Sequence, residues 1–244
     1  MKNIKVYIAA HKTFDLPNKD GYIPLQVGAA LHDDLGYLKD NNGENISEKN
    51  PNYCELTGLY YIWKNESADI VGLSHYRRYF FKNPFKVGLN NVLSIKEIDK
   101  LMDKYDIILP KKYDLELTTK EHYNKFHHLE DLLRCGEIIK KNYKEYYECF
   151  EHILNEKKIY TYNMFIMKKE KFDDYMKWLF DILFQLEREI DISNYDDYNK
   201  RIFGFLSERL FNVWIKKQKF KIKEINVYNI DEKLSLKQKI GDLI

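Results

Sequence analysis

Residues 69–81, with the sequence DIVGLSHYRRYFF, constrain the fold and chemistry of this chain more than any other stretch. Their apolar part, residues 70–73, is long enough for one buried strand and too short for a helix of ordinary length. The sequence then becomes polar, at His75, Tyr76, Arg77 and Arg78. Open α/β sheets bind ligands at the carboxyl ends of their strands, so these four side chains are candidates for a ligand site.

Arg77 and Arg78 are the most informative pair in this stretch. The chain has six arginines among its forty basic residues, and two of the six are adjacent here. A guanidinium group is a planar fork that holds a phosphate with two hydrogen bonds, which an ammonium group cannot do. One interpretation is therefore an anion clamp, most readily for a diphosphate. The alternative is a strand that ends in a solvated basic turn, and these residues alone do not decide between the two.

The size and charge of the chain exclude several classes of protein. A length of 244 residues suits one large α/β domain better than two small ones. A net charge of +2 argues against a dedicated nucleic-acid binder. The three cysteines share no metal-ligand or redox spacing, and no apolar run is long enough for a secretory signal or a membrane span. We therefore expect reduced thiols and a soluble cytoplasmic protein, with peripheral contact to the inner face of the plasma membrane left open.

The amino-terminal part predicts the opening of a nucleotide-binding α/β domain. Residues 4–10 form a strand that ends in His11 and Lys12, but neither Gly-x-Gly-x-x-Gly nor the phosphate-loop lysine motif follows. Dinucleotide and triphosphate sites of those kinds are therefore not expected. Gly28, two residues after Gln26, either allows a close approach of the backbone to a ligand or packs tightly.

Helix signals surround the organising stretch. Asn-Pro-Asn at 50–52 predicts the start of an amphipathic helix over 53–65, with Glu55 in its first turn, where an acidic residue commonly complements the helix dipole. A capping box at Ser94 predicts a second helix over 94–104. A strand over 105–109 follows and ends in a lysine pair, which adds modest support for an anionic ligand at one sheet edge.

The region 118–154 is helical in period and predicts two helices broken near Gly136. His127 and Asp131 are four residues apart, which would place them on one helical face as a base with an orienting carboxylate. The same spacing suits a surface ion pair. A metal site would need a third ligand that the sequence does not show, so no metal site is predicted.

The carboxyl-terminal third contains the second stretch with chemical potential. A strand over 160–167 has Asn163 as its one strongly polar central residue, which needs a partner if buried, and a helix over 169–189 follows. In a helix over 196–216 one stripe holds Asp197, Arg201, Gly204 and Glu208. Gly204 would leave a gap between opposite charges in which a small molecule could bind. Alternatively, Asp197 and Arg201 are an ordinary exposed ion pair and the glycine has no special role.

The chain closes with two further predicted segments. Residues 220–228 alternate in polarity and predict a last strand. The lysine-rich tail 231–244 is either a short amphipathic helix that touches a partner or an anionic membrane, or a frayed terminus. We therefore divide the chain into a main domain over 1–230 and this tail.

The sequence resembles a family of bacterial glycosyltransferases of capsular, exopolysaccharide and O-antigen synthesis that was long catalogued as a domain of unknown function. The matching segments extend over nearly the whole chain and are AAHK (9–12), PLQVGAA (24–30), ISEKNPNYCELTGLYYIWKN (46–65), VGLSHYRRYF (71–80), NMFIM (163–167) and RIFGFLSERL (201–210). The resemblance implies a single α/β domain similar to the glycosyltransferase-A type, with a central mixed, mostly parallel sheet flanked by helices. It also implies transfer of a hexosyl unit, in some members galactofuranosyl, from a nucleoside-diphosphate sugar such as a UDP-sugar to a lipid-linked glycan.

The resemblance gives the polar residues of these segments expected roles. The expected donor-binding residues are His11, Lys12, Gln26, Gly28, Glu55, His75, Tyr76, Arg77, Arg78 and Asn163. Many enzymes of this fold hold a divalent metal with Asp-x-Asp, but here the nearest approach is Asp114-Leu115-Glu116. We therefore expect guanidinium charge in place of a metal, and no cofactor besides the nucleotide-sugar donor.

An inverting transfer needs a base for the acceptor hydroxyl, and Glu208 is the first candidate. His127, Asp131 and Asp197 are the reserves. The alternative function is a non-catalytic carbohydrate- or nucleotide-binding subunit of a polysaccharide assembly, and a hydrolase acting on the same donors is a weaker third. The sequence does not identify the donor sugar, the acceptor, the linkage or the oligomeric state.

Overall fold

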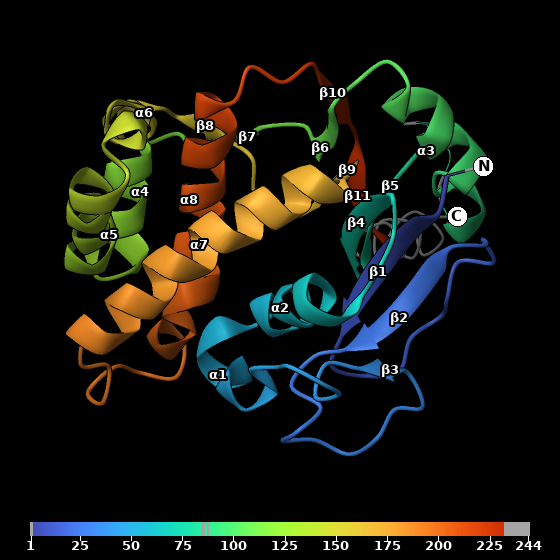
Figure 1. Cartoon of the computed structure of the whole chain (residues 1–244), viewed down its shortest axis with the longest axis horizontal. Helices are drawn as coiled ribbons and strands as arrows, with labels where there is room; N and C mark the ends of the chain where they lie inside the picture. Colours follow the sequence, from blue (N-terminus) through green and yellow to red (C-terminus); the bar gives the residue numbers. More distant parts are fainter. Residues whose placement is uncertain (1, 84–85, 87, 232–244) are drawn as a thin grey trace, which may run out of the picture.

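A nine-stranded sheet flanked by helices forms the centre of the computed structural model, which describes residues 2–83, 86 and 88–231 (Figure 1). Its main path runs β10-β6-β9-β4-β1-β2-β3, and β5 and β11 pair beside β4. The strands are β1 (Ile4–Ala10), β2 (Tyr22–Gln26), β3 (Leu38–Lys39), β4 (Ile70–His75), β5 (Arg78–Phe80), β6 (Ile107–Pro110), β9 (Phe165–Lys168), β10 (Ile222–Ile225) and β11 (Val227–Asn229). A separate pair joins β7 (Tyr113–Asp114) to β8 (Lys158–Ile159).

The sheet is mixed and mostly parallel, as the sequence predicts. β1 is parallel to both β2 and β4, β10 is parallel to β6, and β9 runs antiparallel between β4 and β6. Ala9 pairs with His75 in the β1–β4 register, so the polar ends of these two strands lie next to each other. The predicted fold, one α/β domain with such a sheet, is confirmed.

Helices cover both faces of this sheet. They are α1 (Asn50–Tyr53), α2 (Leu56–Asn65), α3 (Ile95–Met102), α4 (Thr119–Phe126), α5 (Leu129–Asn142), α6 (Lys144–Asn155), α7 (Lys169–Glu189) and α8 (Ile202–Lys217), with short 3₁₀ turns η1 (Ser47–Lys49), η2 (Leu89–Asn91) and η3 (Asn199–Arg201). In Figure 1, α4, α5 and α6 gather at the end of the molecule remote from β2 and β3, and α7 and α8 connect them to the sheet.

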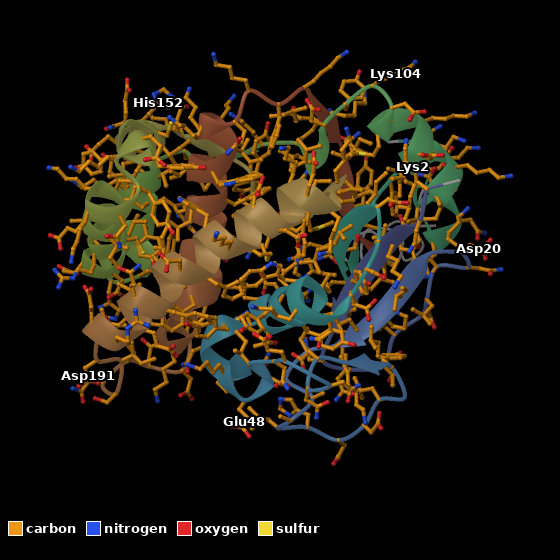
Figure 2. The ribbon with its side chains drawn as sticks, in the orientation of Figure 1. Lys2, Asp20, Glu48, Lys104, His152 and Asp191 are labelled. Atoms are coloured by element: carbon orange, nitrogen blue, oxygen red, sulfur yellow. The ribbon has the colours of Figure 1, made fainter. Side chains whose placement is uncertain are left out.

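The two faces of β4 bury different side chains. Val71 and Leu73 belong to the large core beneath α2, α7 and α8, whereas Ile70 packs with Ile98 of α3 in a smaller core. Burial on both faces explains why the strand reads as a continuous apolar run without alternation. Side chains fill the space between the helices and the strands (Figure 2).

Several predicted elements match the structure closely. β1 and α7 have the bounds that the sequence predicts, and α3 begins with the predicted capping box, in which Ser94 and Glu97 cap each other. Across residues 2–83, 86 and 88–231, no helix combines the length and hydropathy that crossing a bilayer requires. The predicted tail lies outside the described residues from 232 onward, so the domain boundary at 230 stays a prediction.

Other predicted elements are wrong in their boundaries. Residues 118–154 form three helices, with breaks at 127–128 and at Tyr143. Gly136 lies inside α5, where the glycine lets the helix pack against the Phe150 ring of α6. The helix predicted over 53–65 is divided at Cys54, whose φ of 52° ends α1. The strand predicted over 160–167 begins only at Phe165.

Candidate functional site

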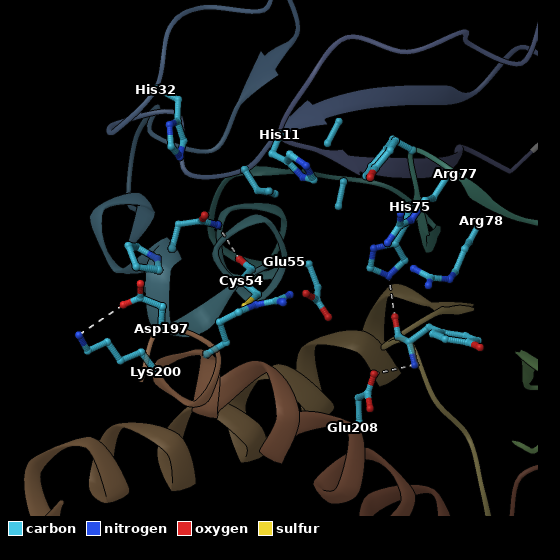
Figure 3. A pocket seen from close by; sticks show the side chains of 18 residues that line it. His11, His32, Cys54, Glu55, His75, Arg77, Arg78, Asp197, Lys200 and Glu208 are labelled. Carbon is cyan, nitrogen blue, oxygen red and sulfur yellow. Dashed lines mark hydrogen bonds and ion pairs between the residues drawn. The ribbon is translucent and has the colours of Figure 1, made fainter. Parts of the chain in front are cut away.

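A cavity of about 870 Å³ opens at the carboxyl ends of β1 and β4, between α1 and α8 (Figure 3). Its lining comes from six separate parts of the chain, which the fold brings together. The lining residues are Ala9, Ala10, His11, Val27, His32, Asn50, Pro51, Cys54, Glu55, His75, Tyr76, Arg77, Arg78, Tyr162, Asp197, Lys200, Arg201 and Glu208.

Eight of the fourteen residues that the sequence proposes for the site line this cavity. They are His11, Glu55, His75, Tyr76, Arg77, Arg78, Asp197 and Glu208. Asn163 lies directly behind the lining and contacts Glu55. The other five, Lys12, Gln26, Gly28, His127 and Asp131, lie outside it.

Arginine is concentrated in this cavity. Arg77, Arg78 and Arg201 are three of the six arginines in the chain, whereas Lys200 is the one lysine among the described residues that lines the cavity. In the described part of the chain neither Arg77 nor Arg78 has a carboxylate within ion-pair distance. The Arg78 guanidinium lies 4.6 Å from the centre of the Tyr162 ring, which holds it without neutralising it. Two uncompensated guanidinium groups therefore face one space.

His75 is oriented by the backbone opposite it. Its Nε2 lies 2.6 Å from the carbonyl oxygen of Tyr162, and a carbonyl only accepts, so Nε2 carries the hydrogen. Burial lowers the pKa of His75, and the charges of Arg78 and Arg77 lower it further. The imidazole is therefore neutral at neutral pH, with Nδ1 as an acceptor.

Residues 162–163 form a left-handed turn on which the polar groups of the site converge. Tyr162 has φ of 73° and Asn163 has φ of 50°, a conformation that costs free energy in residues other than glycine. The Tyr162 N–H donates to Oε1 of Glu208 at 2.9 Å, and its carbonyl accepts from His75. The Asn163 amide donates to Glu55 at 2.7 Å. One turn thus orients three of the titratable groups in the cavity.

Glu208 faces the cavity from α8 with both carboxylate oxygens engaged. Oε1 accepts from Tyr162, and Oε2 accepts from Nη1 of Arg209 at 3.0 Å. Burial raises the pKa of Glu208, and the neighbouring Arg209 opposes that rise. Because the Arg209 side chain is only 5% exposed, this pair is a buried one that fixes the wall of the cavity.

Gln26 and Gly28 support the loop beside the cavity from behind. The Gln26 amide donates to the Asp33 carbonyl and accepts from the Leu35 N–H. Gly28 has φ of +69°, and its N–H donates to the buried carboxylate of Asp40 at 2.8 Å. These hydrogen bonds leave no room for a ligand beside Gln26 and Gly28. Of the two interpretations of Gly28, the structure therefore favours tight packing.

The predicted helical pairing of His127 with Asp131 is wrong, because the two residues belong to different helices. His127 ends α4, with its ring stacked on Phe205 at 4.1 Å, and burial lowers its pKa to about 4. Asp131 is buried in α5 and accepts hydrogen bonds from the Tyr195 hydroxyl at 3.1 Å. Both side chains support the packing of the helices beside the site.

The predicted polar stripe of the last long helix is also altered. α8 begins only at Ile202, so Asp197 lies before the helix, fully exposed at the cavity mouth and 3.6 Å from Lys200. The gap expected at Gly204 is filled by the Cys54 side chain, whose sulfur lies 3.2 Å from where a Cβ would be. Lys12 is exposed and lies 5.0 Å from the ring centre of Tyr76.

Ten of the eighteen lining residues are not proposed as site residues from the sequence, and His32, Cys54, Tyr162 and Lys200 are among them. Cys54 accepts a hydrogen bond from Nε of Arg201 at 3.3 Å, and burial raises its pKa to about 11, so it is a thiol in the resting protein. No sequence signal marks Tyr162, because its backbone contacts with His75 and Glu208 and its ring contact with Arg78 all join distant parts of the chain. Among the described residues no three His, Cys, Asp or Glu side chains are grouped to hold a metal ion.

Comparisons with known proteins bear on this geometry. A family model described as "Domain of unknown function (DUF4422)" matches residues 5–219. The chain belongs to the DUF4422 family. The match includes the whole cavity lining, from Ala9 to Glu208.

A solved structure is similar to this DUF4422 chain in both fold and sequence. It is the apo structure of the bifunctional glycosyltransferase WbbM, with a TM-score of 0.85 and 34% sequence identity over 92% of this chain. The chain spans 45% of the length of the WbbM chain. No curated protein matches the sequence. The similarity relates this DUF4422 chain to part of a glycosyltransferase.

Proposed function

We propose that this protein is an inverting glycosyltransferase that moves a hexosyl unit from a nucleoside-diphosphate sugar to a glycan acceptor. The observation that carries the proposal is the concentration of arginine, rather than lysine, in a cavity at the carboxyl ends of β1 and β4. Arginine forks suit a diphosphate. The likeness to WbbM, a protein described as a bifunctional glycosyltransferase, supports sugar transfer over other reactions of diphosphate compounds.

In this proposal Arg77 and Arg78 bind the diphosphate of the donor. Negative charge builds on that group as the bond from the anomeric carbon to the phosphate oxygen breaks, and guanidinium groups placed there stabilise it. The cavity, at about 870 Å³, has room for a nucleotide sugar, and the half-buried Tyr76 ring, in a T-shaped contact with His11, is an aromatic part of its lining. The arginines would thus supply the charge that a divalent metal supplies elsewhere.

The finer form of the proposal follows from the family resemblance. The donor is a UDP-sugar, the transferred unit is galactofuranosyl or another hexosyl, and the acceptor is a lipid-linked glycan of a surface polysaccharide. A lipid-linked acceptor puts the reaction in the cytoplasm at the inner face of the plasma membrane. A net charge of +2 is compatible with peripheral contact there, without requiring it.

Calorimetry with UDP in the presence of EDTA, followed by a panel of nucleotide sugars, tests the proposal. We expect UDP to bind and at least one donor to be turned over without added metal. Binding without turnover of any donor, in the presence or absence of acceptor glycans, would support a non-catalytic binding subunit instead. Complete loss of turnover in EDTA, restored by Mn²⁺, would contradict the role given to the arginines.

A further inference from the structure

Glu55 differs from Glu208 in how its carboxylate is held. Oε1 of Glu55 accepts a hydrogen bond from Nδ2 of Asn163 at 2.7 Å. In residues 2–83, 86 and 88–231 no donor lies within hydrogen-bond distance of Oε2. Figure 3 shows this carboxylate projecting into the cavity between His75 and the helix that carries Glu208. One oxygen is thus anchored and the other is open to a ligand.

The backbone around Glu55 is built for this position. Cys54, with φ of 52°, interrupts the helical path between α1 and α2 and turns the next residue toward the cavity. Four residues other than glycine have positive φ in the described chain, and three of them, Cys54, Tyr162 and Asn163, adjoin this carboxylate. Such strain persists only where the surrounding structure enforces it, and it is concentrated at functional sites.

Asn163 is itself fixed, so it holds Glu55 in one place. The side chain is 3% exposed, and its Nδ2 also donates to the Ser207 hydroxyl at 2.8 Å. Ser207 in turn donates to the Gly204 carbonyl at 2.8 Å. The anchored oxygen of Glu55 therefore connects to α8 through two buried side chains, the kind of support that a catalytic carboxylate needs.

Burial raises the pKa of Glu208, but its contacts leave neither carboxylate oxygen free to take a proton from an acceptor hydroxyl. Protonation would weaken its bonds to the Tyr162 N–H and to Arg209, and it would leave the buried Arg209 guanidinium without a counter-charge. Removing one charge of a buried pair is costly. The same protonation would loosen the turn that orients His75.

The negative charge of Glu55 affects the pKa values of His75 and Arg201, which face it. It opposes the effect of burial on the pKa of His75, and together with Cys54 it raises the pKa of Arg201 against burial. The carboxylate therefore lies within electrostatic range of both the imidazole on the β4 side and the guanidinium at the cavity mouth. An acceptor hydroxyl that enters past Arg201 would meet the open oxygen of Glu55.

We propose that Glu55 is the catalytic base of the transfer and that Glu208 is a positioning residue, an inference that rests on the function proposed above. Oε2 of Glu55 takes the proton from the acceptor hydroxyl, and the acceptor oxygen forms its bond to the anomeric carbon. The bond from that carbon to the diphosphate breaks, its electron pair goes to the diphosphate oxygen, and Arg77 and Arg78 stabilise the charge. Asn163 keeps the base in line for this step.

Two isosteric variants separate the two carboxylates. Glu55→Gln is expected to lower kcat at saturating donor by about 100-fold or more, the scale of a lost general base, with the Kd for UDP within twofold of wild type. Glu208→Gln is expected to raise the KM for the donor, through the loosened turn at Tyr162, and to lower kcat by less than tenfold. Glu137→Gln, on an exposed carboxylate of α5, is the matched control and should behave as wild type.

Chemical rescue supplies a second measurement. Added formate would not restore kcat if the lost carboxylate had only a structural role. Glu55→Ala with added formate should regain part of its kcat, and Glu208→Ala should not. A thermal melt of each variant checks that it is folded. Near-normal kcat in Glu55→Gln would overturn the inference while leaving the proposed function intact. So would the opposite result, in which Glu208→Gln loses kcat and Glu55→Gln only raises the KM for the donor. A wild-type protein that turns over no donor would instead refute the proposed function, and the inference with it.

Discussion

Replacing Arg78 with lysine tests the role of the arginine pair while keeping the charge. The guanidinium of Arg78 has no carboxylate partner in the described chain, and the Tyr162 ring 4.6 Å away holds it over the cavity. A lysine there retains one positive charge but offers a single point of contact in place of the fork. The perturbation is therefore geometric, and it leaves the net charge of the cavity unchanged.

The expected loss of affinity follows from the contacts that the change removes. One hydrogen bond to a charged group contributes about 1.5–3 kcal/mol, and the stacking of a guanidinium on an aromatic ring contributes a further 0.5–1 kcal/mol or so. A lysine ammonium recovers part of this. A net loss of about 2 kcal/mol corresponds to roughly 30-fold weaker binding of UDP, since 1.4 kcal/mol is tenfold.

Calorimetry with two ligands measures the effect and its origin. UDP carries the diphosphate and uridine lacks it, so Arg78→Lys should weaken UDP and leave uridine unchanged. Arg134→Lys is the matched control, because Arg134 pairs with Glu137 and Glu189 on the exposed surface of α5 and α7. Wild-type affinity of Arg78→Lys for UDP, or an equal loss for UDP and uridine, would refute the assignment of this arginine to the diphosphate.

Three further predictions concern the frame around the cavity. Burial lowers the pKa of His127 to about 4 against about 6.5 in the unfolded chain, so stability should fall as pH drops from 7 toward 4, by about 2 kcal/mol at pH 5. Urea unfolding should show this loss and His127→Gln should reduce it; an unchanged pH dependence in the variant would contradict the cause. Asp40→Asn should destabilise by about 3 kcal/mol in the same assay, because the buried carboxylate accepts from four donors, and a change under 1 kcal/mol would contradict this. Gly136→Ala should cost about 1–3 kcal/mol through overlap with the Phe150 ring, despite the better helix propensity of alanine, and a stabilised variant would show that Phe150 yields.

Local sequence signals predict the parts of this structure that local forces determine. The capping box at Ser94 and the apolar period of residues 169–189 specify α3 and α7 without reference to the rest of the chain. The change from apolar to polar residues after 70–73 likewise predicts that Arg77 and Arg78 lie at a strand end. These features depend on neighbours within a few residues, which is why they can be predicted from one sequence.

The features that sequence reasoning missed depend on distant parts of the chain. The spacing of His127 and Asp131 indicates one helical face, but the helix ends between them, and His127 packs on Phe205, far along the chain. The gap expected at Gly204 is filled by Cys54 from a different element. Neither contact leaves a trace in local composition, so periodicity alone predicts the wrong arrangement.

In the proposed mechanism, the left-handed turn at 162–163 couples the residues that bind the donor diphosphate to the carboxylates on the acceptor side. Its carbonyl orients His75 on β4, its ring supports Arg78, and its N–H and the adjoining amide hold the two carboxylates. A substitution at Tyr162 would remove the ring that supports Arg78 but would keep a backbone N–H and a carbonyl at this position. A glycosyl transfer needs the leaving diphosphate and the incoming hydroxyl to be in line at the same moment. Under the proposed function, one strained turn that contacts both sides would provide that alignment, because a shift of His75, Glu208 or Glu55 would have to break a hydrogen bond to residues 162–163.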